Sequence, residues 1–403
     1  MGAKTLCIFC EAELGPDTKP EHIMLNALGG RRTTKRVICS KHNNDFGGGI
    51  DNALAKQIEV LRNLLQLESG TGKLPPALKN LQAGSERINI RNDGRPELVK
   101  PPFTVTDLPD GKFNVEFLAR SSEDIKKMLP HLAARLRMTE EEVIKQITQN
   151  GQAAIVEMQP DTVHHHISLG CEEALRSMAK SCLVLLATVT GNGAVKAAPF
   201  AAARNYVLNG SPEFNKERTQ IDSRDVPSVD DLRNRFGPFF NLIYIRSDDA
   251  GRVIGHFTIY NAISWQIVLA EAGGPPNGVA AIVSNPLEPA TWEDVASSLP
   301  DIPFGWLDAA DRVYEIERAR ERLVAMVKHH VDNARKTETA RICDDVFAKH
   351  GVTDDDQPIA DPNAQQTIVG EIARRLAAHA LGLRHEQKLS PEETEAMLRC
   401  KKK

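Results

Sequence analysis

The sequence lacks several features that would assign it to a protein class directly. Its 403 residues carry a net charge of −4, so it has no overall basic excess of the kind expected in a protein that coats nucleic acid. No apolar run approaches the ~18 residues of a membrane-spanning helix, and no apolar segment of a signal peptide follows Met1. We therefore expect a soluble protein of two or three domains, in which any contact with nucleic acid comes from local basic patches.

Cysteine is scarce as well, but three of the seven cysteines fall into two short motifs near the N-terminus. The motifs are Cys7-x-x-Cys10 and Cys39-x-x-His42. Two ligand pairs at this spacing predict a closed, structural zinc site with three thiolates and one imidazole. The alternative is that the cysteines are buried thiols and the histidine lies at the surface. Thiols used for metal imply a reducing compartment, so we expect a cytoplasmic protein.

The segment between the two pairs combines a polar strand end, a glycine turn and a basic run. Glu21 and His22 are expected at the end of a short strand, after which Gly29 and Gly30 turn the chain. A second strand over 37–38 is expected to lead to the second ligand pair. The basic residues before it are Arg31, Arg32, Lys35 and Arg36. Such a run is suited to contacts with phosphate.

The order of CxxC, EHI, LGG and CxxHNNDFGGGID resembles the zinc-bound branch of the HNH endonucleases, over about residues 7–51. The resemblance implies a ββα-metal fold, in which a two-stranded hairpin and a following helix grip a catalytic cation. It also implies that His22 is the general base that activates water against a phosphodiester. Glu21 and Asn43 would be ligands of Mg²⁺ or Mn²⁺. Oxygen ligands suit Mg²⁺, and a neutral imidazole suits proton removal from water.

Two features depart from the usual pattern of that family. The second ligand pair ends in a histidine instead of a cysteine, and zinc accepts either ligand. The segment 31–38 contains no asparagine, so the middle letter of the HNH motif has no assigned residue.

The whole chain predicts an α+β multidomain protein: a zinc-bound head over 1–68, an α+β middle domain over 80–300 and a helical C-terminal region over 304–403. Asp51 is expected to cap a helix over 52–67, with a functional role as the alternative. Three or four antiparallel strands are expected over 86–119. Other strands are expected at 153–158, 239–245, 253–260 and 265–270. Helices are expected at 121–136, 139–149, 172–186, 197–208, 308–335, 338–349, 365–382 and 391–400.

No second catalytic constellation is recognisable in the rest of the chain. His164, His165 and His166 are interpreted as a polar strand end, because no carboxylate or cysteine pair accompanies them at ligand spacing. His256 and Glu271 are interpreted as structural or surface groups, since neither has a partner at a recognisable spacing.

Three functions remain open at this point. The first is a metal-dependent endonuclease, acting on DNA rather than RNA, whose C-terminal domains target or regulate it as in bacterial defence or restriction systems. The second is a non-catalytic zinc-knuckle protein that binds nucleic acid through its basic run. The third is an interaction protein in which zinc only stabilises the fold. A homodimer or a regulatory partner would use the middle or helical region.

Overall fold

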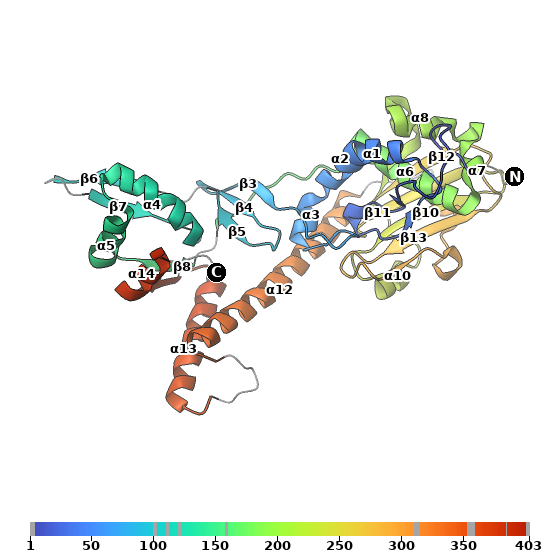
Figure 1. Ribbon diagram of the computed structural model, residues 1–403. Coiled ribbons are helices and arrows are strands. Elements are labelled where there is room, and N and C mark those ends of the chain that lie inside the picture. The colour runs from blue at the N-terminus through green and yellow to red at the C-terminus, as the bar shows by residue number, and fades with distance from the viewer. Residues whose placement is uncertain are drawn as a thin grey trace. The chain divides into compact units, whose positions relative to one another are not determined.

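The structure is a computed structural model that describes residues 5–99, 103–109, 113–119, 122–157, 160–309, 315–352, 359–383 and 385–399. The chain divides into two compact units, each described separately below (Figure 1). The first joins the residues up to Leu78 with Asn92–Gly94 and His166–Val331, and the second contains Lys79–Arg91, Arg95–His165 and the residues from Asp332 onward. This grouping differs from the predicted boundaries, because the head and part of the middle segment belong to one unit.

The first unit begins with a short hairpin followed by a helix. Strand β1 (Glu21–His22) pairs antiparallel with β2 (Thr33–Thr34). The 3-10 helix η1 (Asn26–Leu28) and the glycine pair connect them. Gly29 has a φ of +84°, and a Cβ on Gly30 would lie 2.0 Å from the Met24 carbonyl oxygen, so the turn requires glycine at both positions.

Helix α1 (Ser40–Gly48) follows the hairpin, so the order of elements is the ββα order that the resemblance implied. The predicted strand over 37–38 is wrong. The second strand lies earlier, at β2, and Val37 and Ile38 form a buried connection whose apolar side chains fill the core. The Val37 carbonyl accepts a hydrogen bond from the Ile8 N–H (3.0 Å). This bond joins the two knuckles, the short segments that carry the ligand pairs Cys7/Cys10 and Cys39/His42.

The helix predicted over 52–67 is interrupted. It consists of α2 (Ile50–Gln57) and α3 (Glu59–Leu64), which meet at Ile58. The predicted apolar face is buried, as Leu54, Ile58, Leu61 and Leu65 all lie in the core. The capping role predicted for Asp51 is wrong. Gly49 is the N-cap, and Asp51 lies in the first turn with its side chain directed to another helix.

A six-stranded antiparallel sheet is the centre of the first unit, in the order β14-β13-β10-β11-β12-β9. Side chains of β10 alternate between its two faces, so Ile243 and Ile245 join one core while Leu242 and Tyr244 join the other. The strands are β9 (Thr219–Asp222), β10 (Asn241–Ser247), β11 (Val253–Ile259), β12 (Ile263–Ala270), β13 (Val279–Ser284) and β14 (Trp292–Glu293).

Helix α6 (Glu172–Thr190) packs on one face of this sheet, and α2 packs on α6. Apolar residues of the head, α6 and the sheet form one continuous core. The head is therefore not a separate piece that depends on zinc alone for a core. The other helices of this unit are α7 (Asn192–Lys196), η3 (Ala198–Phe200), α8 (Ala201–Asn209), α9 (Pro212–Arg218), α10 (Val229–Phe236), η4 (Ala296–Ser298) and α11 (Phe304–Leu307).

The second unit combines small sheets with helices. Its three-stranded sheet and two-stranded sheets contain β3 (Leu78–Ala83), β4 (Glu86–Ile90), β5 (Pro96–Leu98), β6 (Phe103–Asp107), β7 (Phe113–Phe117), β8 (Ala154–Glu157) and β15 (His385–Lys388). Its helices α4 (Ser122–Leu136), α5 (Glu140–Asn150) and α14 (Pro391–Arg399) share a small core. Thr139 and Glu142 form the capping box that was expected at the start of α5. Strand β15 was not predicted.

The C-terminal region contains a helix longer than expected. Helix α12 (Ile316–Lys349) runs without interruption where two helices were predicted, and α13 (Pro362–Ala380) follows. The first part of the predicted 308–335 helix falls partly on residues 310–314, which lie outside the described residues. Among the helices that the structure describes, none is long and apolar enough to cross a membrane.

Candidate metal centre and active site

The two predicted ligand pairs converge on one point. The four donor atoms lie within 4.8 Å of one another, and within the described ranges they form the one group of three or more cysteine, histidine or carboxylate side chains placed to hold a metal ion. The His42 Nδ1 atom lies 3.6 Å from Cys7 Sγ and 3.4 Å from Cys39 Sγ, and the Cys10 and Cys39 sulfurs are 3.9 Å apart. A tetrahedral Zn²⁺ with Zn–S bonds of ~2.3 Å would separate its sulfurs by ~3.8 Å. The cluster therefore fits zinc.

Burial shapes the protonation of these ligands. It raises the pKa of the Cys7 thiol to about 12, and it lowers the pKa of His42. A neutral imidazole is ready to bind metal, whereas the buried thiol would ionise only when a cation compensates its charge. The His42 ring also stacks on Phe46, with 5.6 Å between ring centroids, which holds its orientation.

Two side chains from helix α7 brace both knuckles. Lys196 Nζ donates to the carbonyl oxygens of Cys7 (3.2 Å) and Cys10 (2.9 Å). Asn192 Nδ2 donates to the carbonyls of Leu6 (2.6 Å) and Arg36 (2.8 Å). These bonds satisfy loop carbonyls that the short knuckles cannot satisfy themselves. The sequence carried no signal for these contacts, because they join positions more than 150 residues apart.

The residues predicted to be catalytic lie on β1 and α1, and Asn43 directly follows the candidate zinc ligand His42. His22 is half-buried on β1, and Glu21 beside it is only 4% exposed. Asn43 on α1 donates from Nδ2 to the Pro20 carbonyl oxygen (3.0 Å), so the helix that carries His42 is tied to the start of β1. Burial lowers the pKa of His22, and the charge of Lys180 lowers it further.

Lys180 of α6 lies at the centre of a buried polar network that sequence reasoning missed. Its Nζ lies 2.5 Å from Glu21 Oε1 and 2.7 Å from Asp51 Oδ2. Ser177, one turn earlier on α6, donates to Asp51 Oδ1 (2.6 Å). Burial opposes the ammonium charge, but the two carboxylates outweigh it and raise the pKa of Lys180. A helical pattern of apolar residues around Lys180 was the one available signal, since a lysine inside a buried stretch needs a partner.

The basic run is exposed, but two of its members are engaged within the protein. Arg32 Nε forms an ion pair with Asp294 (2.9 Å), and Lys35 Nζ donates to the Pro16 carbonyl (3.0 Å). No such partner is found for the charged groups of Arg31 and Arg36 within the described residues.

Comparison with known proteins agrees with this geometry. Residues 7–59 match the family of HNH endonucleases. The match covers the hairpin, the cysteine and histidine cluster, α1 and α2, and it indicates a nuclease head. No curated protein and no solved structure matches the chain.

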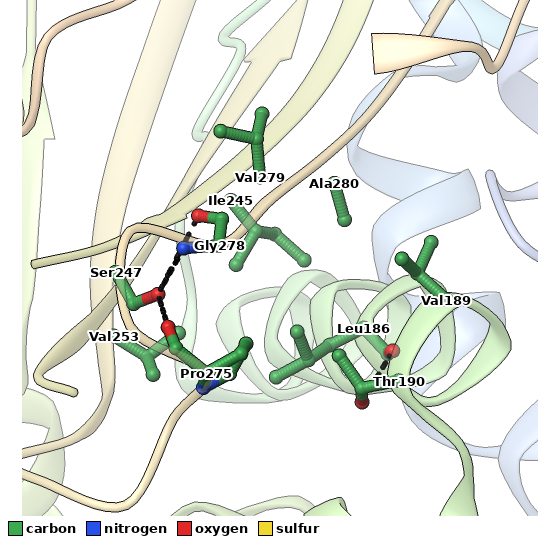
Figure 2. A pocket seen from close by; sticks show the side chains of 10 residues that line it. All are labelled: Leu186, Val189, Thr190, Ile245, Ser247, Val253, Pro275, Gly278, Val279 and Ala280. Atoms are coloured by element: carbon green, nitrogen blue, oxygen red, sulfur yellow. Dashed lines mark hydrogen bonds between the residues drawn. The ribbon is translucent and has the colours of Figure 1, made fainter.

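Other candidate features contribute no site. The histidines at 164–166 are exposed. A pocket of about 170 Å³ lies between the end of α6 and strands β10, β11 and β13 (Figure 2). Apart from Thr190 and Ser247 its lining residues are apolar, and the Ser247 hydroxyl already donates to the Pro275 carbonyl and accepts from the Gly278 N–H (2.9 Å). None of the residues predicted for the active site lines this pocket.

Proposed function

We propose that the segment 7–59 is the catalytic head of a metal-dependent endonuclease that hydrolyses phosphodiester bonds in nucleic acid. One observation carries the proposal. Glu21 and His22 are neighbours on β1, and Asn43 ties the start of that strand to the helix that carries the zinc ligand His42. A closed zinc centre of this kind has a structural role, so it would position the acid–histidine pair and take no part in the chemistry.

His22 is assigned as the general base. Its lowered pKa keeps the imidazole neutral at pH 7, and a neutral imidazole can remove a proton from water. The residue is half-buried and so remains partly exposed, which a base must be to reach a water beside the substrate.

Glu21 and Asn43 are assigned as ligands of a divalent cation. Lys180 holds Glu21 through Oε1, and Oε2 has no hydrogen-bond partner among the described residues. Asn43 donates from Nδ2 to Pro20, so its Oδ1 is the atom left for a hard cation. Mg²⁺ or Mn²⁺ bound there would supply positive charge opposite the phosphate and the leaving oxygen.

Nucleic acid would approach over the basic run. Arg31 and Arg36 are exposed, and cationic side chains there would bind phosphate without reading base identity. Within this proposal the substrate is DNA. The protein is assigned to the cytoplasm, since the zinc thiolates need reducing conditions. The rest of the chain would target or regulate the head, as in the bacterial defence and restriction systems that the head resembles.

A second candidate function is a zinc-knuckle protein that binds nucleic acid without cleaving it. The burial of Glu21 and its ion pair with Lys180 favour this alternative, because a cation ligand must also be reached by the cation. Cleavage separates the two functions. Purified protein should nick supercoiled plasmid in the presence of Mg²⁺ or Mn²⁺ and lose that activity in excess chelator, with an RNA of matched length as a second substrate. Retained binding without cleavage under either metal would favour the binding protein.

A further inference from the structure

Lys180 lies outside the segment that matches the nuclease family, yet it contacts the candidate active site directly. The residue is 1% exposed and belongs to α6, 159 positions from Glu21. Its ammonium is shared between Glu21 and Asp51, at 2.5 and 2.7 Å. Asp51 is in turn fixed by the Ser177 hydroxyl at 2.6 Å. The network thus ties β1 and α2 of the head to a single turn of α6.

Breaking this contact would cost free energy, because it would leave buried charged groups without a partner. The contact is therefore suited to holding the three side chains in a fixed arrangement. One ammonium faces two carboxyl groups in a site from which water is largely excluded. Burial raises the pKa of Glu21, and the charge of Lys180 opposes that shift. Removing the lysine would leave two buried carboxylates without a counter-ion. A buried ion pair also restricts the rotamers of its members, so the contact with Lys180 limits the orientations that the Glu21 side chain can adopt.

The orientation of Glu21 matters because β1 is only two residues long. Its pairing with β2 involves two residue pairs, Glu21 with Thr34 and His22 with Thr33. So short a ladder does not hold a strand rigidly by itself. The Lys180 contact adds an anchor at the residue next to His22, on the side of the strand that faces α6.

We propose that Lys180 is a positioning residue of the head. Through its contact with Glu21 it fixes β1 on α6, and it thereby fixes the position of His22, the next residue of the same strand. The inference rests on the proposed function for its catalytic meaning but not for its structural content. The head is accordingly completed by α6, and residues 7–59 do not contain every residue that the site needs.

The test measures backbone amide exchange of the full-length, zinc-loaded protein by mass spectrometry. The main variant is Lys180→Met combined with Asp51→Asn, which removes one cationic and one acidic side chain together. We expect amides of the peptide around β1 to exchange at least ~10-fold faster, while α1 and the zinc content stay unchanged. Ser181→Ala is the matched control, because Ser181 is equally buried on the same helix and its hydroxyl has no hydrogen-bond partner among the described residues.

A second variant and a rescue complete the design. If the double variant fails to retain zinc, Glu21→Gln replaces it, since this change leaves a neutral Lys180–Asp51 pair and removes only the ionic contact to β1. Lys180→Arg keeps the cation and should preserve most of the protection of β1.

In the plasmid assay the double variant should lose at least ~10-fold in cleavage rate at saturating Mg²⁺, and the control should not. Loss of protection in a protein whose wild type never cleaves would support the positioning role and reject the nuclease. Exchange of β1 equal to that of wild type in both test variants would overturn the positioning role.

Discussion

The Lys180 ammonium lies 2.5 Å from the Glu21 carboxylate, in a site where both side chains are almost completely buried. The contact joins a strand of the predicted head to the long helix on the central sheet. It makes the head part of a larger folded unit, with consequences for stability and for the proposed catalysis.

The stability of the first unit should depend strongly on this lysine. Lys180→Met alone should lower the free energy of unfolding by ~3–5 kcal/mol, because two buried carboxylates lose their counter-ion. Adding Asp51→Asn should recover part of that loss. Urea denaturation followed by circular dichroism would measure both values. If Lys180→Met alone were as stable as wild type, the network would contribute little to folding.

Zinc should stabilise the same unit. Cys39→Ala should lose stoichiometric zinc and lower the melting temperature, since metal binding is coupled to folding. Because the head shares its core with α6 and the sheet, we expect a shift of the whole first transition and not a separate melting of the head. Metal analysis and calorimetry would show this. Cys171→Ala is the control, as Cys171 is exposed and far in sequence from the cluster. Full zinc occupancy in Cys39→Ala would remove Cys39 from the site.

The four basic residues should not contribute equally to nucleic-acid binding. Arg31→Ala with Arg36→Ala should flatten the dependence of log affinity on log salt by ~1.8, because each phosphate of duplex DNA that is no longer neutralised reduces the slope by ~0.9. Arg32 and Lys35 should matter less, because Asp294 and the Pro16 carbonyl already engage them. Salt titrations on two unrelated sequences would test this, with Lys216→Ala as an exposed control on α9. Weaker binding confined to one sequence would point to base recognition instead.

The sequence predicted the metal cluster and the hairpin-to-helix order because these depend on local spacing and on turn chemistry. That information lies within some forty residues. It is carried by cysteine and histidine pairs at fixed intervals and by a glycine pair that no other residue could replace. The prediction failed for Asp51, since the sequence around it has an ordinary helix-capping pattern. Only the tertiary contact with Ser177 and Lys180 shows what its carboxylate does.

The domain boundaries illustrate the same limit. The predicted head over 1–68 looks like an independent zinc module in sequence, because nothing local indicates that Leu54 and its neighbours pack on a helix more than a hundred residues away. The bracing of both knuckles by Asn192 and Lys196 was likewise invisible, since single polar residues on a short helix have no pattern. These features depend on contacts between residues that are far apart in the sequence. Such contacts leave no periodic pattern in a single sequence from which they could be predicted.

Cleavage should persist into mildly acidic solution. Burial and the Lys180 charge lower the pKa of His22 below its ordinary value of ~6.5, so protonation of the base should reduce the rate only below that pH. The same shift means that the unfolded chain binds this proton more readily than the folded protein, so acid should also weaken folding in that range. A profile of kcat/KM against pH at saturating Mg²⁺ would locate the acidic limb. A limb centred above 6.5 would contradict the assignment of an unprotonated, buried base.

The central claim is that His22 removes a proton from the attacking water, and one comparison tests it most directly. Cleavage of supercoiled plasmid by wild type and by His22→Ala should be measured at matched protein and zinc content, over a series of Mg²⁺ and Mn²⁺ concentrations. His131→Ala, an exposed histidine on α4, is the control. We predict a loss of ~10²-fold or more for His22→Ala that no metal concentration restores, with zinc content and DNA affinity unchanged. Losses in Glu21→Ala and Asn43→Ala should be partly recovered by added metal. Equal cleavage by wild type and His22→Ala would contradict the account, and cleavage by neither under any metal would leave the protein as a binder of nucleic acid.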